Sequence, residues 1–222
     1  MYIGRRLIRH NAKAGSHGPK RRRLMVAMTG MCVSLGLSGC ASLPRATILS
    51  DAQRVELARA SAYLNELHRF SANFVQTGYF GAGQGQVWVS RPGKLRLRYG
   101  DGLAKDMVAN HGVIEVRDLA NGSVTTMRLS RSPINLLLAS QIDLAARAGV
   151  ASVTSTDAGL VVKVYDPQTP AEGTLTLGFR RHPLTLTFVQ AQDLRGRSFT
   201  LQLTDITPQA AVPPGTFVLP EG

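Results

Sequence analysis

The sequence from residue 85 to residue 99 reads GQVWVSRPGKLRLRY, and this stretch decides the fold. Val87 and Val89 alternate with bulkier or polar neighbours, an Arg-Pro-Gly turn follows, and Leu95 and Leu97 then alternate with basic residues. A period of two is typical of a strand with one buried face, and a Gly-containing break between two such runs is typical of a hairpin. The stretch therefore predicts two antiparallel strands that share one apolar face.

Similar runs surround this hairpin. The period of two begins at Phe74, an Asn-Gly turn at residues 121–122 separates the next two runs, and Pro or Gly residues bound the others. Consecutive strands at hairpin distance predict an antiparallel meander, and a single apolar face predicts that only one side of the sheet is covered. The later strands are expected at 113–118, 124–129, 160–165, 174–180, 184–190 and 198–205.

A helix is expected before the sheet. Ser50 and Gln53 have the spacing of a capping box, and Asp51 would lie near the positive end of the helix dipole. Apolar residues then recur at helical spacing up to about Arg69. We expect the buried stripe to consist of Val55, Ala58, Ala62 and Leu67, widened by Leu57, Leu64 and Phe70.

A second helical region interrupts the strands between Ser132 and Ala148. A Ser-Pro pair opens it, proline suits the first turn of a helix, and a run of leucines follows. We expect one or two short helices there, which close over the apolar face together with the first helix. The fold class is thus α+β, mainly β.

The chain from about Leu57 to Pro220 resembles the LolA-like lipoprotein carriers. The most specific part is Phe-x-x-x-Phe-x-Gln at residues 70–76, followed by Gly-x-Val-x-Val-x-Arg-Pro-Gly-Lys at 85–94. The resemblance implies an incomplete antiparallel β-barrel, a curved sheet lidded by helices, whose hydrophobic cavity carries lipoprotein acyl chains across the periplasm. It also implies that Arg91, followed by Pro92, acts in lid closure and release, and that Lol-type proteins are partners.

Candidate cavity residues follow from the alternation of the strands and from position on the expected lid. Because a slip of one residue turns every side chain of a strand to the other face, the selection depends on register. The residues expected to contact acyl chains of lipoproteins or other lipids are Phe74, Val87, Val89, Leu95, Leu97, Leu136, Leu137, Leu177, Phe179, Leu186 and Phe188.

The first 39 residues have the composition of a secretory signal peptide. Eight Lys or Arg and no acidic residue precede Leu24, and residues 24–39 carry no charge but are shorter than the roughly 20 that span a bilayer. Without those eight, 18 basic residues face 14 acidic ones, so the mature chain has a net charge of about +4. This small excess argues against nucleic-acid binding.

The leader ends in Leu37-Ser38-Gly39-Cys40, which resembles the lipobox of bacterial lipoproteins. The resemblance implies that Cys40 is lipidated and anchors the protein; Ala41 after it implies sorting to the outer membrane, facing the periplasm. The alternative is an ordinary cleavage site and a soluble periplasmic protein. We therefore divide the chain into a signal peptide (1–39), a short tether (40–50) and a LolA-like domain (51–222). Two roles are compatible with these features: an anchored receptor of the LolB type and a carrier.

No pattern of catalysis, cofactor or metal binding is present in the sequence. His68, His111 and His182 each stand alone, without a metal-binding or nucleophile motif nearby. We therefore expect a non-enzymatic protein without cofactor or metal. Two alternatives remain: a structural envelope lipoprotein whose core is filled, and a hydrolase in which one of these histidines meets a Ser and an acid in space.

Overall fold

A computed structural model describes residues 42–219, except for the side chain of Asp101. Its first helix, α1 (Asp51–Glu66), begins where the capping box predicts: Gln53 N donates to Ser50 Oγ at 3.3 Å, and Ser50 N donates to Gln53 Oε1 at 2.9 Å. The helix ends three residues earlier than expected because the chain from Arg69 onward pairs as a strand. Residues 42–50 before it form neither helix nor strand, and Thr47 N donates to Val150 O at 2.7 Å.

The buried face of α1 differs from the predicted apolar stripe. Val55, Ala58 and Ala62 are exposed, whereas Leu57, Leu64 and the residues at 60, 61 and 67 are buried. The buried positions recur at three and four residues, as one face of a helix requires. One of these buried residues is Ser61, which a hydrophobic pattern does not identify. Its hydroxyl forms the two hydrogen bonds described below.

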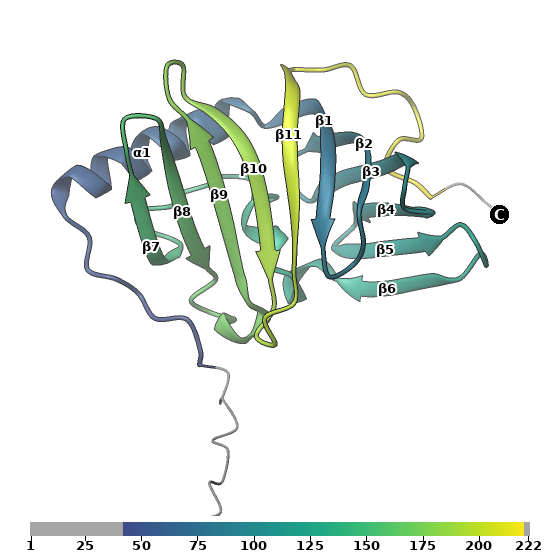
Figure 1. The fold of residues 1–222 in the computed structure, drawn as a ribbon, viewed down its shortest axis with the longest axis horizontal. Helices are drawn as coiled ribbons and strands as arrows, with labels where there is room; N and C mark the ends of the chain where they lie inside the picture. The colour runs from purple at the N-terminus through teal and green to yellow at the C-terminus, as the bar shows by residue number, and fades with distance from the viewer. Residues whose placement is uncertain (1–41, 220–222) are drawn as a thin grey trace, which may run out of the picture. The chain divides into compact units, whose positions relative to one another are not determined.

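Eleven antiparallel strands form one curved sheet (Figure 1). Two of them, β4 and β7, were not predicted, because their apolar residues show no clear alternation in the sequence. The strands are β1 (Arg69–Gly78), β2 (Gly83–Ser90), β3 (Lys94–Asp101), β4 (Lys105–Asn110), β5 (Val113–Asp118), β6 (Val124–Arg128), β7 (Gly149–Ser155), β8 (Gly159–Tyr165), β9 (Thr174–Arg180), β10 (Thr185–Gln192) and β11 (Ser198–Pro208).

The sheet consists of two meanders joined in its middle. Its order is β6-β5-β4-β3-β2-β1-β11-β10-β9-β8-β7, so all neighbours are consecutive in sequence except β1 and β11. These two strands pair from Phe70 with Pro208 to Gly78 with Phe199. The outer strands β6 and β7 do not pair with each other. The expectation of an incomplete antiparallel barrel is therefore confirmed.

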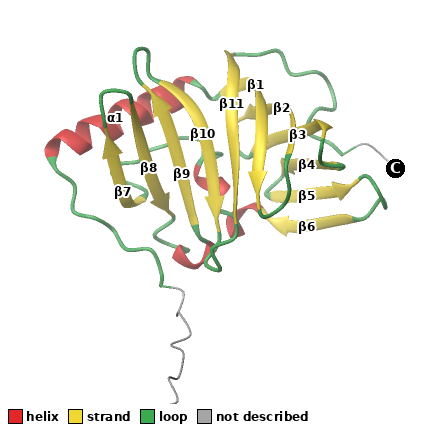
Figure 2. Cartoon of the chain, viewed as in Figure 1, coloured by secondary structure: helices red, strands yellow, loops and turns green. Residues whose placement is uncertain are grey.

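The chain between the two outer strands crosses one face of the sheet, and we call residues 129–148 the lid segment. It contains two short 3₁₀ helices, η1 (Leu129–Arg131) and η2 (Pro133–Leu136), followed by turns. Ser132 Oγ accepts from Ile134 N at 3.4 Å, as the Ser-Pro signal suggests. In Figures 1 and 2, α1 and this segment lie behind the sheet, on the face that we call the inner face.

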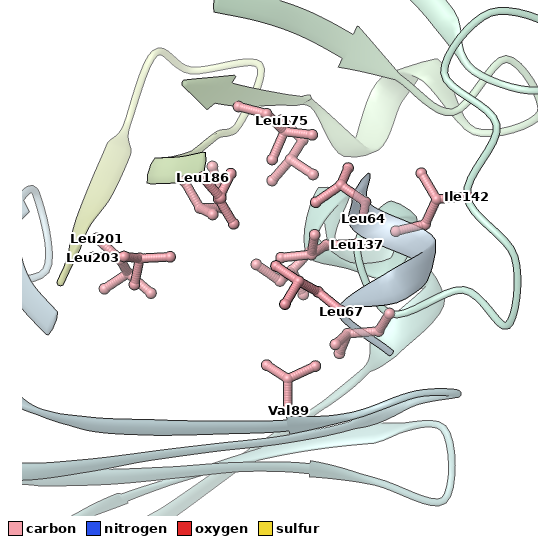
Figure 3. Packing of buried hydrophobic residues seen from close by; sticks show 14 of the residues in the cluster. Leu64, Leu67, Val89, Leu137, Ile142, Leu175, Leu186, Leu201 and Leu203 are labelled. Carbon is pink, nitrogen blue, oxygen red and sulfur yellow. The ribbon is translucent and has the colours of Figure 1, made fainter. Parts of the chain in front are cut away.

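The inner face, α1 and the lid segment share one buried hydrophobic cluster. Burial of each large aliphatic side chain contributes about 1.5 to 3 kcal/mol, so this cluster is the main source of stability. Figure 3 shows side chains of the helical cover and of both meanders that point toward one another: Leu64, Leu67, Leu137 and Ile142 from the cover, and Val89, Leu175, Leu186, Leu201 and Leu203 from the sheet.

The outer face of the first meander is covered by the C-terminal segment, residues 209–219. Arg96 of β3 is almost completely buried there; it pairs with Asp106 of β4 and donates to Val218 O at 2.8 Å. Asn110 likewise donates to Phe217 O at 3.0 Å. Burial lowers the pKa of Arg96 and raises the pKa of Asp106, because both charges lose water, and their mutual attraction opposes both shifts.

Candidate functional site

The structure brings most of the predicted cavity residues together on the inner face. They belong to the buried cluster, and each exposes only a few per cent of its surface. Leu136 packs against the cluster while remaining partly exposed. The inner face is thus closed in this conformation by α1 and the lid segment. The predicted residues in the cluster are Phe74, Val87, Val89, Leu95, Leu97, Leu137, Leu177, Phe179 and Leu186.

Phe188 is the exception, and its predicted orientation was wrong. The register between β9 and β10 shifts between Leu186 and Phe188, so strict alternation fails there. Phe188 pairs with Gly178 and with the exposed Gln202, both on the outer face. A Cβ at Gly178 would approach the Phe188 ring to 1.9 Å, so only glycine leaves room for this ring. The bulge instead turns Val189 inward.

The sequence reasoning missed the part of the inner surface that comes from the cover. Leu57 of α1 and Leu138, Ile142 and Leu144 of the lid segment are all buried in the cluster. The lid segment has no regular period because most of it consists of turns, so its buried side chains could not be selected by spacing. Strand β8 also contributes Leu160, Val162 and Val164, whose alternation in the sequence is a signal that identifies this face.

Two polar side chains of α1 attach the lid segment. Asn65 Nδ2 donates to Ile142 O at 2.8 Å, and Ile142 N donates back to Asn65 Oδ1 at 2.9 Å. One turn earlier, the buried Ser61 hydroxyl donates to Leu57 O at 2.7 Å and accepts from Leu144 N at 3.0 Å. These contacts satisfy backbone groups of Ile142 and Leu144 that would otherwise be buried unpaired.

Arg91 connects the sheet to both parts of the cover. It follows β2, and a cis peptide bond joins it to the exposed Pro92. Its guanidinium donates to Leu64 O near the end of α1, and to Asn65 Oδ1 and Ala139 O, each at 3.4 Å. The last turn of α1 contains no basic residue, so Arg91 supplies the cation that its free carbonyls favour. Burial lowers the pKa of Arg91.

The polar groups that face the interior are paired. Tyr99 Oη donates to Oε1 of the buried Gln76 at 2.6 Å, and burial raises the pKa of Tyr99. Tyr63 Oη accepts from Leu186 N at 3.1 Å, and burial raises its pKa too. This interior therefore offers an apolar environment for binding.

The three candidate histidines lie at the surface, and the described residues contain no metal-binding cluster. His68, His111 and His182 are all exposed, and the last two occupy turns with positive φ. No group of three or more potential metal ligands occurs between residues 42 and 219. Over the same range, no helix has the length and hydrophobicity needed to cross a bilayer. The lipidation expected at Cys40 lies outside the described residues.

Comparison with known proteins gives a family match over most of the chain. A family model described as outer membrane lipoprotein carrier protein LolA matches residues 65–220. No curated protein sequence matches significantly.

Solved structures with a similar fold have low sequence identity to this chain. A DUF1329 family protein from Desulfovibrio piger has a TM-score of 0.48 and 9% identity, with 74% of this chain and 95% of that chain covered. A LolA superfamily protein from Nitrosomonas europaea has a TM-score of 0.42 and 9% identity, with coverages of 78% and 99%. A putative outer membrane lipoprotein-sorting protein domain from Vibrio parahaemolyticus has a TM-score of 0.43 and 8% identity, with coverages of 74% and 95%.

The attachment of the lid segment can be tested by hydrogen exchange. Asn65→Ala removes both contacts with Ile142 and leaves its backbone groups unpaired, which costs about 1 to 3 kcal/mol. Amides around residues 139–145 should then exchange about tenfold faster. The matched control is Asn73→Ala, because Asn73 bonds the exposed Asp205 side chain at 2.9 Å on the outer face. Equal protection of the lid in both variants would show that Asn65 does not hold it.

Proposed function

The chain belongs to the LolA family of outer membrane lipoprotein carrier proteins, and from this premise we propose that it binds acyl chains of lipids or lipoproteins without catalysing a reaction. The observation that carries the proposal is the apolar inner face of an unclosed sheet, covered by a separate lid segment. Polar contacts of Ser61, Asn65 and Arg91 fix this lid at its margin. Opening the lid would expose aliphatic side chains to a bound hydrocarbon chain.

The energetic balance supports a site that opens and closes. Each methylene removed from water contributes about 0.8 kcal/mol, so one long acyl chain gains on the order of 10 kcal/mol from burial. In the closed conformation Leu137, Leu138 and Ile142 occupy the inner face instead. An acyl chain therefore competes with the lid for the same surface. The observed affinity for the acyl chain equals the intrinsic affinity multiplied by the fraction of molecules whose lid is open.

A lid truncation separates this proposal from a structural lipoprotein with a filled core, an alternative favoured by the nearly complete burial of the inner face. The wild-type domain should exchange a fluorescent fatty acid. Leu137→Ala should lower the free energy of unfolding by about 2 to 5 kcal/mol. It should also raise the affinity about tenfold, because the closed lid packs less well.

Val108→Ala is the control, since Val108 is also buried but lies outside the inner-face cluster, on β4 opposite Arg96 of β3. It should destabilise the protein without a gain in affinity. If the wild-type protein and both variants fail to take up the fatty acid, the filled-core alternative is correct.

We further propose that Arg91 promotes release of the bound chain. Its hydrogen bond to Leu64 O holds Arg91 against α1, and its hydrogen bond to Ala139 O is made when the lid is closed, so together they stabilise the closed, empty form. Stabilising the empty form favours expulsion of the ligand, because the two forms are in equilibrium. Proline at position 92 directs the turn that carries Arg91, and we assign it no contact with the ligand.

The release role predicts a kinetic effect for Arg91→Leu. The variant should fold, since leucine can occupy the same partly buried position. Transfer of bound lipid or lipoprotein to acceptor membranes should be about tenfold slower, because hydrogen bonds to a charged group contribute about 1.5 to 3 kcal/mol to the closed form. Arg59→Leu, on the exposed side of α1, serves as the control. Unchanged transfer by the Arg91 variant would exclude the role.

We also propose that residues 1–39 are removed on export and that lipidated Cys40 anchors the domain to the outer membrane, facing the periplasm. The support is the lipobox pattern in the sequence together with the family match. An anchored protein would receive acyl chains from a soluble partner of the Lol type rather than shuttle by diffusion.

Mass spectrometry of the intact protein purified from membranes tests the anchor. The mature chain should begin at Cys40 and carry the added mass of a diacylglyceryl group, and usually of an amide-linked acyl chain as well. Cys40→Ala should move the protein from the membrane fraction to the soluble fraction. An unmodified mature chain would instead support the soluble periplasmic alternative.

A further inference from the structure

A pocket of about 590 Å³ lies at one end of the inner face. It is formed where strand β6 and the start of the lid segment approach η3 (Pro170–Glu172) and the turn between β10 and β11. This volume is within the range of about 300 to 1,000 Å³ that is usual for small-molecule sites. None of the cavity residues predicted from the sequence lines it.

The floor of the pocket continues the buried cluster. Ala191 and Phe199 pair across β10 and β11, and both line the pocket. Two residues further along these strands, Val189 and Leu201 also pair and belong to the cluster. Because side chains two residues apart lie on the same face of a strand, the apolar surface runs without a break from the pocket to the core.

The outer wall of the pocket is apolar and partly exposed. Phe80 is 49% exposed and Met127 is 46% exposed, although both line the pocket. The Phe80 ring contacts Phe199 edge to face at 6.0 Å and Tyr79 at 5.2 Å. An exposed aromatic pair beside an opening of this size provides an apolar contact at the water boundary.

Three arginines line the pocket, and their pairing differs. Arg131 bonds Glu172 at 3.4 Å across the opening, and Arg197 bonds Asp193 at 2.6 Å. Arg128, the last residue of β6, has no carboxylate partner among residues 42–219. The pocket therefore combines an apolar floor with one uncompensated positive charge at its rim.

We propose that this pocket holds the negatively charged head of a bound lipid, with its carboxylate or phosphate on Arg128 and its first methylenes against Phe80 and Phe199. This inference rests on the proposed binding of acyl chains by the inner face and adds a preference to it. The ligand class is an anionic amphiphile whose chain enters the protein through this end. A guanidinium suits such a head because it donates to both oxygens of a carboxylate or phosphate.

Three ligands with the same palmitoyl chain test the proposal: palmitate, palmitoyl-lysophosphatidylglycerol and uncharged monopalmitin. Each displaces a fluorescent fatty-acid probe from the full mature domain, and an affinity is obtained from the displacement. Arg128→Gln should weaken the two anionic ligands about fivefold and leave monopalmitin unchanged, as expected for loss of one partly solvated ion pair. Arg128→Lys should retain most of the preference. If Arg128→Gln weakens the binding of palmitate alone, or of the phosphate ligand alone, the result identifies the preferred head group and still supports the site.

Arg180→Gln is the matched control, because Arg180 is exposed at the other end of β9 and its loss changes the net charge equally. Equal affinities of all three ligands for wild type, or equal losses for all three in Arg128→Gln, overturn the proposal while leaving acyl-chain binding intact. Loss of the preference in Arg180→Gln also overturns it, since the effect is then one of net charge. Failure of every ligand to bind the wild-type domain overturns this proposal and the proposed function together.

Discussion

The pairing of β1 with β11 is the interaction on which the rest of the structure depends. It joins two meanders into one sheet, whose outer strands β6 and β7 do not pair with each other. Because the barrel does not close on itself, its inner face needs another cover, and α1 and the lid segment provide it. An apolar surface covered by a separable segment differs physically from a barrel filled by its own strands, and it is the basis of the binding proposal.

The cover is held by two kinds of interaction with different consequences. Leucines of the lid segment pack on the inner face without directional preference, whereas Asn65, Ser61 and Arg91 bond particular backbone groups. Apolar packing can be exchanged for packing against hydrocarbon at little cost, since both remove similar surface from water. The hydrogen bonds cannot be replaced by an acyl chain. They therefore favour the closed form specifically and set how far a ligand must shift the equilibrium.

Much of the fold could be predicted from the sequence, because local sequence patterns specify its helix and most of its strands. The capping box at Ser50 located the start of α1, and alternation around residues 85–99 located the β2–β3 hairpin and four inner-face residues. The errors arose where tertiary contacts override local pattern: Ser61 is buried because it bonds the lid, and a bulge turns Phe188 outward. No spacing rule predicts that Arg128 and Phe199 line the same pocket, since these residues are distant in sequence.

The position of the last strand in the middle of the sheet has a consequence for biosynthesis. As the ribosome releases the chain from its amino end, β1 has only one of its two neighbours until residues 198–208 have been made. Until then, the free edge of β1 presents unpaired backbone N–H and C=O groups. A pairing between strands so distant in sequence forms slowly, and unpaired edges aggregate during that interval. A chain of this design is therefore exposed to edge-to-edge aggregation until its final strand is available.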